Sequence, residues 1–470
     1  MTCVNRPLTL LLMTLILGGL FVRPAQANNP VTFANCRLGL AGGYESIVAD
    51  YNVSQLNLGL FLDYGSRSSL PAGLPSGIDY LQIVRVHQNK VGGWNSAYVD
   101  PPSYRVWPSP ATIAENAASL PGSYWFIGNE PDRKDHQYGG QDETTPELYA
   151  TIYHDIRAVI KAADPTARVG PAGIVQATPL RLIYLEKVWD SYQAQYGYSM
   201  GQDIDVWNMH GFILREIDGT WGAELPPGLV EGVDYTGPQD GFLSNSSGSQ
   251  AMAAHHNVDY FIEFTRSMRQ WMADHGERNK PLINTEFGIL YKSNKISNTN
   301  VKDFMNGSFD FLFNATDSDI GYPSDENRLV QRWTWFSLDT SDSNGALFST
   351  STKNLTTFGT NWKNYIANAQ SHPLAAVPQQ NLLVSNLRTT PGQVVSPNTF
   401  VDFTLSADVA NSGNSPTTTG DAIRVSFWDG DPNAPESGQI GSTQTIADLP
   451  GCGQVTTVQV EWPNKLDPEN

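Results

Sequence analysis

Short apolar runs recur along residues 37–336 and alternate with longer stretches that have the features of helices or loops. The runs are rich in β-branched and aromatic residues and end on Gly, Pro or polar residues, which is typical of buried strands. We therefore predict eight strands in this part of the chain. Their expected ranges are 37–41, 58–63, 80–86, 124–127, 167–172, 204–210, 281–288 and 329–336.

Helices are expected between several of these strands. The sequence Thr145-Pro146-Glu147 is a strong helix start, because Thr can cap the helix and Pro occupies its first position. This helix is expected to end near residue 163. A second helix, rich in Leu and Tyr, is expected to follow the fifth strand and end near residue 199, and a third is expected from about 258 to 275. Alternating strands and helices predict an α/β fold, either a parallel barrel or a doubly wound sheet. No dinucleotide-type glycine loop opens any helix, which favours the (β/α)8 TIM barrel.

The pattern changes after residue 372. Residues 373–380 are predicted to be a linker, and from residue 381 short alternating runs are separated by Ser, Thr, Gly and Asn. Examples are 382–387, 400–409 and 423–428, which predict an all-β, immunoglobulin-like sandwich over residues 381–470. Residues 455–462 are expected to form the penultimate strand of the sandwich, and the sequence ends eight residues later, so we expect the sandwich to be incomplete there.

The N-terminus has the features of a secretory signal. Arg6 precedes an apolar run from 8 to 22, and Ala25-Gln26-Ala27 is a small-x-small cleavage site. We therefore expect a mature barrel domain from residue 28 to 372 in a secreted or cell-surface protein, although an uncleaved anchor remains an alternative. Two cysteines, Cys36 and Cys452, lie outside the signal, and the sequence leaves open whether they pair.

The charge balance excludes some partners. Formal net charge is −18, and no basic stretch offers a footprint for nucleic acid or an anionic membrane. No His/Cys cluster has metal-ligand spacing, so neither a metal nor a cofactor is predicted.

Two glutamates end predicted strands. Glu130 follows the fourth strand and Glu286 lies near the end of the seventh. Strand ends three apart in an eight-strand ring face each other across the mouth, where barrel enzymes place their chemistry. A pair of carboxylates there is what glycoside hydrolysis needs. A solvated carboxylate or an ion pair is the alternative for either residue alone.

Gly128-Asn129-Glu130-Pro131-Asp132 resembles the acid/base motif of the clan A retaining glycoside hydrolases, which are (β/α)8 barrels. The sequence INTEFG at 283–288 resembles the nucleophile strand of that clan, and 345–348, 356–359 and Trp362 resemble its closing segment. The resemblance covers about residues 37–370. It implies that Glu130 is the general acid/base, that Glu286 is the nucleophile and that Asn129 bonds the sugar 2-hydroxyl. It also implies that Trp335 forms an aromatic floor under the sugar.

Other polar residues lie at predicted strand ends. His210 ends the sixth strand and is a candidate for binding substrate or orienting Glu286, with a structural role as the alternative. Arg85 and His87 share one face of the third strand, and either line the cleft or form a buried ion pair that holds a barrel layer. Asp63 ends the second strand and is a similar candidate. Three further tryptophans in predicted loops, at 94, 107 and 221, suit either sugar stacking or loop packing.

The C-terminal part, 381–470, resembles the CARDB-type sandwich modules of bacterial surface proteins through LVSNL at 383–387, DVANSG at 408–413 and VSFWDG at 425–430. The resemblance implies a spacer or a cell-surface attachment module. Taken together, the sequence predicts a secreted retaining glycosidase that acts on β-linked carbohydrate. The alternative is a catalytically silent glycan-binding or surface-adhesion protein built on the same barrel.

Overall fold

The structure is a computed structural model that describes residues 33–42, 47–93, 95–135, 140–392, 400–417 and 422–466. The expected signal and Trp94 lie outside these residues. The chain divides into two compact units, which meet in sequence between Pro378 and Gln379. No helix among the described residues has both the length and the apolar character needed to cross a membrane.

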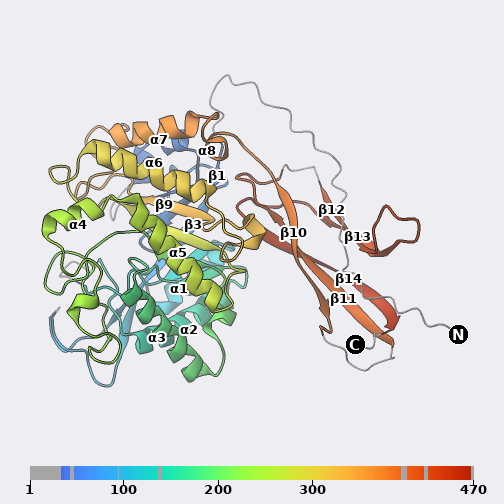
Figure 1. The fold of residues 1–470 in the computed structure, drawn as a ribbon, viewed down its shortest axis with the longest axis horizontal. Coiled ribbons are helices and arrows are strands. Elements are labelled where there is room, and N and C mark those ends of the chain that lie inside the picture. The colour runs from blue at the N-terminus through green and yellow to red at the C-terminus, as the bar shows by residue number, and fades with distance from the viewer. Residues whose placement is uncertain are drawn as a thin grey trace. The chain divides into compact units, whose positions relative to one another are not determined.

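Eight parallel strands form the sheet of the first unit (Figure 1). Their order around the sheet is β6-β5-β3-β2-β1-β9-β8-β7. The ring is nearly closed, because β6 and β7 are joined by Asp205 N–H to Val169 O and by His210 N–H to Ile174 O, both at 2.9 Å. This confirms the predicted barrel and its eight strands. They are β1 (Asn35–Ala41), β2 (Leu58–Asp63), β3 (Asp79–Gln88), β5 (Tyr124–Ile127), β6 (Arg168–Pro171), β7 (Trp207–His210), β8 (Leu282–Gly288) and β9 (Arg332–Phe336).

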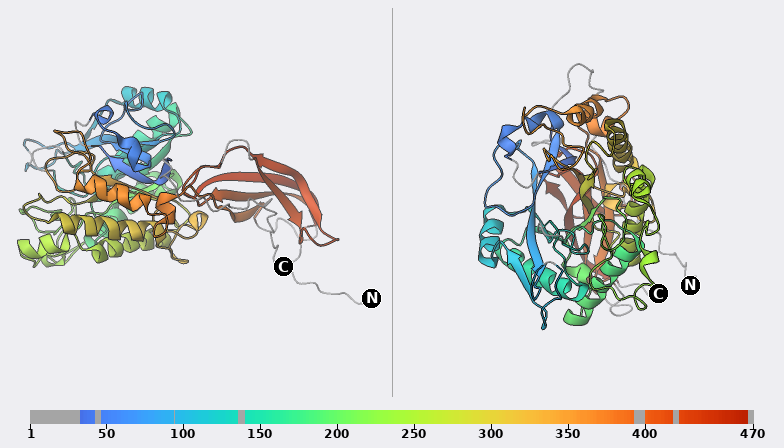
Figure 2. Two further views of the ribbon diagram at one scale, coloured as in Figure 1. Left: turned by 90° about the horizontal axis from the view of Figure 1, so that it is seen from above. Right: turned by 90° about the vertical axis from the view of Figure 1, so that its left-hand side faces the viewer.

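Helices surround the sheet, and neighbours along the chain pack together, as α2 does with α3 and α6 with α7 (Figures 1 and 2). The predicted start of α2 is confirmed, with Thr145 as its N-cap and Pro146 as its first residue. The helices are α1 (Pro110–Ser119), α2 (Pro146–Ala163), α3 (Pro179–Tyr196), α4 (Gly248–Ala254), α5 (Val258–Asp274), α6 (Asn298–Asn314), α7 (Thr357–Ala367) and α8 (Pro373–Ala376). Short 3₁₀ turns occupy Val48–Asp50, Val53–Leu56, Met200–Asp203, Pro238–Asp240 and Pro323–Asp325.

Side chains alternate between the inside of the barrel and the helix layer, as the pleat of a strand requires. The inward residues form one buried cluster that includes Leu60, Leu62, Leu81, Ile83, Phe126, Val206 and Ile283. Their neighbours in sequence pack between strands and helices, as do Phe61, Trp125, Trp333 and Trp335. This alternation decides which side chains at the strand ends can reach the barrel mouth.

Two features of the barrel unit differ from the expected pattern. Strand β4 (Tyr104–Trp107) pairs antiparallel with the end of β3, where Trp107 lies opposite Arg85. The predicted linker contains α8, whose Ala375 is fully buried and whose Leu374 carbonyl accepts a 2.8 Å hydrogen bond from Asn35 Nδ2. Cys36 on β1 is buried and in disulfide form.

The second unit contains two antiparallel sheets. One has the order β10-β11-β14 and the other pairs β12 with β13. Residues from both sheets, among them Val409, Phe427 and Val460, share one hydrophobic cluster, which is consistent with a β-sandwich (Figure 2). Cys452 is buried and in disulfide form. The strands are β10 (Leu382–Thr390), β11 (Phe400–Asn411), β12 (Ile423–Asp429), β13 (Gly438–Ile446) and β14 (Gln454–Leu466).

Candidate active site

The backbone turns sharply where β5 ends. Gly128 has a φ of 98°, and a Cβ on it would lie 3.2 Å from Val86 Cγ2 and 3.3 Å from Ala172 Cβ. Glu130 has a φ of 50°, a left-handed conformation that is strained for a residue with a side chain. The Glu130 side chain is only 2% exposed. The turn therefore holds a carboxylate above the end of a core strand at a conformational cost, as is common in functional sites.

A β-bulge aims Glu286 into the barrel. The pairing register of β8 shifts on both of its sides, between Asn284 and Phe287. As a result two consecutive side chains face inward: Thr285 Oγ1 donates to Asn208 Oδ1 at 2.7 Å, and Glu286 contacts His210. Phe287 then returns to the outer cluster. Bulges re-aim side chains in this way beside active sites.

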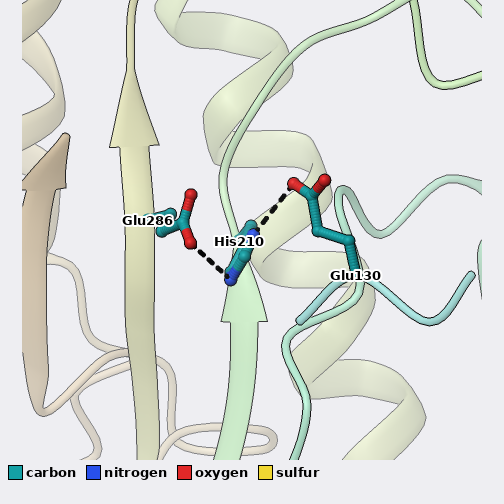
Figure 3. Close-up of side chains that lie close together, drawn as sticks. All are labelled: Glu130, His210 and Glu286. Carbon is teal, nitrogen blue, oxygen red and sulfur yellow. Dashed lines mark hydrogen bonds and ion pairs between the residues drawn. The ribbon is translucent and has the colours of Figure 1, made fainter. Parts of the chain in front are cut away.

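His210 lies between the two glutamates (Figure 3). Its Nδ1 is 3.1 Å from Glu130 Oε1 and its Nε2 is 3.6 Å from Glu286 Oε1. One carboxylate oxygen of each glutamate and one ring nitrogen all lie within 4.8 Å of one another. The ring fits because the neighbouring residue is Gly173, where a Cβ would lie 2.4 Å from His210 Cδ2. The two glutamates predicted from distant parts of the sequence therefore meet around one imidazole.

Glu130 is surrounded by hydrogen-bond donors. Arg133 Nη1 donates to its Oε2 at 2.9 Å, and Gln141 Nε2 donates to the same oxygen at 3.3 Å. Burial acts to raise the pKa of Glu130, but the charge of Arg133 and the hydrogen bond from His210 outweigh it and lower that pKa to about 2. These contacts therefore favour the ionised form of Glu130.

Glu286 has the opposite environment. Glu286 is 5% exposed, and its Oε1 has no hydrogen-bond partner among the residues that the structure describes. Burial raises its pKa, the charge of His210 opposes this, and Glu130 adds to the rise, which brings the pKa to about 7. The Tyr64 hydroxyl lies close enough to Glu286 to lower this pKa, although the two do not form a well-aligned hydrogen bond. The environment of Glu286 therefore raises its pKa, whereas the environment of Glu130 lowers that of Glu130.

Glu130, His210 and Glu286 are of residue types that bind metal ions, and one ligand atom of each lies within 4.8 Å of the others. The two imidazole nitrogens face different carboxylates at 3.1 and 3.6 Å, and Arg133 occupies the other oxygen of Glu130. Metal–ligand bonds of about 2.0–2.2 Å would require the three ligand atoms to converge on a single point. The arrangement fits a hydrogen-bonded chain better than a set of metal ligands.

Arg85 and His87 face inward from β3 and meet on one buried carboxylate. Arg85 Nη2 is 2.7 Å from Asp142 Oδ1, and His87 Nε2 is 3.2 Å from the same oxygen. The other Asp142 oxygen accepts the backbone N–H groups of Val86 and Asn129 at 3.0 and 2.9 Å. Burial lowers the pKa of His87 despite Asp142. Arg85 and His87 therefore form the buried ion pair that was the alternative to lining the cleft. Asp142 also fixes the segment that carries Glu130 through its bond to Asn129 N–H.

Asp63 lies elsewhere than predicted. Leu60 and Leu62 face the barrel interior, so alternation turns Asp63 toward the helix layer. There it accepts from Tyr80 Oη at 3.1 Å and pairs with Arg67. The next residue, Tyr64, is the one that reaches the mouth and Glu286.

Trp335 also differs from its predicted role. It is completely buried among Phe287, Phe304 and Phe309, and its Nε1 donates to Gly345 O at 2.8 Å, so no ring face is open to a sugar. Alternation instead places Phe336 at the barrel mouth, with ring centroids 6.4 Å from Tyr64 and 6.2 Å from Phe212.

The remaining candidates lie around the mouth. Asn129 is buried, its Nδ2 donates to Gly140 O at 2.9 Å, and its Oδ1 has no hydrogen-bond partner within the described part of the chain. Trp107 on β4 is 66% exposed, and Trp221 is 49% exposed and packs on Tyr291 at 4.4 Å between centroids. These two indoles have surface available for stacking on a sugar.

Residues of the site that were not singled out from the sequence include Arg133, Asp142 and Tyr64. Arg133 and Asp142 lie in loops, and the hydrophobic pattern of a sequence does not predict the course of a loop. The position of Tyr64 could have been predicted, because Leu60 and Leu62 face inward and alternation along the strand turns Tyr64 inward as well.

Substitutions of the adjacent residues Asp63 and Tyr64, at the end of β2, test the roles of the two faces of that strand. We expect Tyr64→Phe to lower kcat about tenfold, because the loss of one hydroxyl near Glu286 removes roughly 1.4 kcal/mol of charge stabilisation. Asp63→Asn should leave kcat within a factor of two, since Asp63 faces the helices. Steady-state kinetics of both variants check this. Equal losses would show that the hydroxyl of Tyr64 has no special role.

One family model matches part of the chain. Residues 231–362 match the family described as "Glycosyl hydrolase catalytic core". The matched segment contains Glu286, but it does not reach Glu130. Among curated proteins, none matches this chain.

Several solved glycosidase structures resemble the chain at low sequence identity. A GH128 subgroup II endo-β-1,3-glucanase from Sorangium cellulosum is 15% identical, covers 70% of this chain and 98% of its own, and has a TM-score of 0.41. A glucosidase from Croceicoccus marinus is 10% identical, with coverage of 93% and 95% and a TM-score of 0.42. A GH5_18 protein from Streptomyces cattleya in complex with GlcNAc is 10% identical, with coverage of 71% and 80% and a TM-score of 0.40.

Proposed function

We propose that the barrel unit is a glycoside hydrolase that cleaves β-glycosidic bonds of a polysaccharide or glycoside with retention, by a double displacement that uses Glu130 and Glu286. The observation that carries this proposal is the convergence of the two carboxylates at the barrel mouth, with oxygens within 4.8 Å of each other. The match of residues 231–362 to a glycosyl hydrolase core supports the same class.

The spacing of the carboxylates favours retention. Retaining pairs lie about 5–5.5 Å apart, whereas inverting pairs lie about 6.5–9.5 Å apart to admit a water molecule. Oxygens within 4.8 Å leave little room for a water between a carboxylate and the anomeric carbon. Direct attack by a carboxylate on that carbon is therefore the better fit.

In the proposed reaction Glu286 attacks the anomeric carbon and Glu130 protonates the leaving oxygen. Water, deprotonated by Glu130, then releases the sugar from Glu286. Asn129, Phe336, Trp107 and Trp221 are the proposed sugar-contacting side chains. Asn129 brings a buried oxygen to which no described residue donates a hydrogen bond, and the aromatic residues bring apolar ring surface at the mouth.

The carboxylate pair should set the pH dependence of the enzyme. Between the pKa of about 2 for Glu130 and that of about 7 for Glu286, the pair holds one proton, which is the state that double displacement needs. We expect kcat/KM to fall tenfold per pH unit above about pH 7, because the pair then loses the proton that the leaving group requires. Initial rates from pH 3 to 9 measure this. A plateau that continues to pH 9 would contradict it.

The proposal is tested with the secreted chain on a panel of aryl β-glycosides, glucans, xylans and mannans. We expect turnover of at least one member of this panel, with an anomeric product of unchanged configuration in ¹H NMR. Glycan binding without turnover by the wild type would instead favour the silent glycan-binding protein. Binding that depends only on residues 379–470 would favour an adhesion protein.

The location of the protein is also a proposal. We propose export directed by residues 1–27 and a spacer or cell-surface attachment role for the C-terminal sandwich. Fractionation of cells that express the full chain tests both, because deletion of residues 379–470 should move the protein from the surface to the medium.

A further inference from the structure

Two tryptophans at the barrel mouth keep much of their side chain exposed, and they lie on opposite sides of the ring of strands. Trp107 is 66% exposed and Trp221 is 49% exposed. Trp107 is on β4, which pairs with β3, whereas Trp221 is on the loop after β7 and packs on Tyr291, which follows β8. Strands β3 and β8 are four places apart in the ring of eight, so the two indoles lie across the mouth from each other.

The side chain of Trp107 points to the inner face of the barrel sheet. It stands directly opposite Arg85 in the antiparallel pair of β3 and β4, and opposed residues lie on the same face of a sheet. Because Arg85 faces inward, Trp107 does so too. The indole lies beside Gly65, where a Cβ would be 3.9 Å from Trp107 Cζ3. Gly65 follows Tyr64, whose hydroxyl lies beside Glu286. Trp107 is therefore on the side of the mouth where Glu286 would hold the transferred part of the substrate.

Trp221 lies on the side of Glu130 that faces away from the second carboxylate. Oε1 of Glu130 faces His210, whereas Oε2 accepts a hydrogen bond from Arg133 Nη1 at 2.9 Å. The same guanidinium donates from Nη2 to Gly222 O at 2.9 Å, so the segment that contains Trp221 lies beyond Oε2. In the proposed reaction Glu130 protonates the leaving oxygen, and the leaving sugar must lie beside this carboxylate. Trp221 is therefore on the leaving-group side.

The backbone around Trp221 is fixed although its ring is half exposed. Its carbonyl accepts from Arg215 Nε at 3.4 Å, and Ala223 N–H donates to Arg215 O at 3.0 Å. The ring packs on Tyr291 with 4.4 Å between centroids. A single exposed apolar side chain is common on a protein surface. An indole on a fixed backbone beside a carboxylate pair is a different case, because it can bind a sugar with little further loss of conformational entropy.

We propose that the substrate is a β-linked polysaccharide that lies across the mouth and is cleaved inside its chain. A sugar of the leaving part would stack on Trp221, and a sugar beyond the one attacked by Glu286 would stack on Trp107. This inference rests on the proposed function and adds the kind of substrate and the mode of attack. An indole offers a large apolar face to the C–H surface of a sugar ring. An enzyme that removes only the terminal sugar has no sugar beyond the attacked one to place on Trp107.

Glycosyl fluorides separate the two sides, because fluoride leaves without a sugar on the leaving side. The probes come from the polysaccharide that the wild type hydrolyses fastest: its monosaccharide β-fluoride, its disaccharide β-fluoride and its hexasaccharide. For Trp107→Ala we expect kcat/KM to fall about tenfold or more with the disaccharide fluoride and less than about twofold with the monosaccharide fluoride. For Trp221→Ala we expect about a tenfold or greater fall with the hexasaccharide and less than about a twofold fall with both fluorides. Equal losses on all three substrates would overturn the inference, because a damaged fold slows them alike.

Conservative and remote variants provide the controls. Trp107→Phe and Trp221→Phe keep an aromatic face and should retain most of the activity on the hexasaccharide. Phe400 is also a strongly exposed aromatic residue, at 73%, but it belongs to β11 of the second unit. Phe400→Ala should leave the rates on all three substrates unchanged. Losses in Phe400→Ala as large as those of the tryptophan variants would contradict a specific role for the indoles of the mouth.

The products from the intact polysaccharide test the mode of attack. We expect a mixture of oligosaccharides from the earliest time points, and a viscosity that falls faster than reducing ends accumulate. Release of monosaccharide alone, or hydrolysis of aryl glycosides but of no polysaccharide, would overturn this inference and leave the proposed retaining hydrolysis intact.

Binding keeps the inference testable if no glycoside is hydrolysed, a result that would defeat the proposed function. Isothermal titration of the wild type with hexasaccharides of glucans, xylans and mannans measures the affinity without turnover. We expect Trp107→Ala and Trp221→Ala each to weaken the tightest of these complexes by about tenfold or more. Equal affinities in the wild type and both variants, or no binding by the wild type, would overturn the inference.

Discussion

Replacing Glu286 with Gln is expected to lower kcat by about 10⁴-fold or more, whatever the leaving group. The amide cannot attack the anomeric carbon, and the bulge on β8 aims residue 286 at His210. Glu130→Gln should behave differently. It should cost about 10²–10⁴-fold with a poor leaving group but little in the first step with a dinitrophenyl glycoside. Steady-state and burst kinetics on both glycosides separate the two roles.

Glu286→Gln also serves as its own folding control. The pKa of Glu286 is raised in the folded protein, so its contribution to stability is full below the unfolded value near 4.5 and is lost as the pH rises through about 7. Gln carries no such penalty, so Glu286→Gln should match the wild type in melting temperature at pH 4 and exceed it at pH 8. A variant that is inactive and less stable at both pH values would point to a damaged fold rather than a lost nucleophile.

Replacing Arg181 with Met is expected to destabilise the barrel unit by about 3–5 kcal/mol, because it leaves two buried carboxylates without a cation. Arg181 is completely buried, with its Nη1 3.3 Å from Asp132 Oδ2 and its Nε 3.1 Å from Glu216 Oε1. It also donates to the carbonyls of Ala223 and Glu224. For a unit of this size we expect the melting temperature to fall by roughly 5 °C.

Activity should also fall in Arg181→Met, because the triad of Asp132, Arg181 and Glu216 connects the loop after β7 to the turn that carries Glu130. Arg133 binds Glu130 and also donates to Gly222 O at 2.9 Å within that loop. Lys134→Met is the matched control. Its partly exposed ion pair with Asp218 should be worth less than about 1 kcal/mol. Equal melting temperatures for the two variants would contradict the structural role of the triad.

The barrel was predictable because its strands are buried on both faces and appear as short apolar runs. Runs such as 80–86 and 124–127 therefore identified β3 and β5, and counting them placed Glu130 and Glu286 on facing strands. Strand β4 was missed because it is four residues long and only half buried.

Side-chain direction was harder to predict. Strict alternation explains why Asp63 and Trp335 turn to the helix layer while their neighbours Tyr64 and Phe336 face the mouth. The same rule would have turned Glu286 outward, together with Leu282 and Asn284, had the register of β8 not shifted. Nothing in the sequence marks that bulge, since its cause is pairing with two neighbouring strands.

The electrostatics of the site depended on distant contacts. His210 was predicted to orient Glu286 or bind substrate, but its contact with both carboxylates required the closure of β7 against β6. Arg133 lies three residues after Glu130, and only the left-handed turn at Glu130 returns its guanidinium to that carboxylate. Resemblance implied that Glu130 is the acid, while the contacts with Arg133 and His210 lower its pKa.

The central claim is that Glu286 forms a covalent bond to the sugar opposite Glu130. It is tested most directly by incubating the protein with the 2-deoxy-2-fluoro dinitrophenyl derivative of the sugar that it hydrolyses fastest, followed by peptide mass spectrometry. We predict one glycosyl adduct on the peptide that contains Glu286 and none in Glu286→Gln. An adduct on Glu130, or turnover that releases a product of inverted anomeric configuration, would contradict the account.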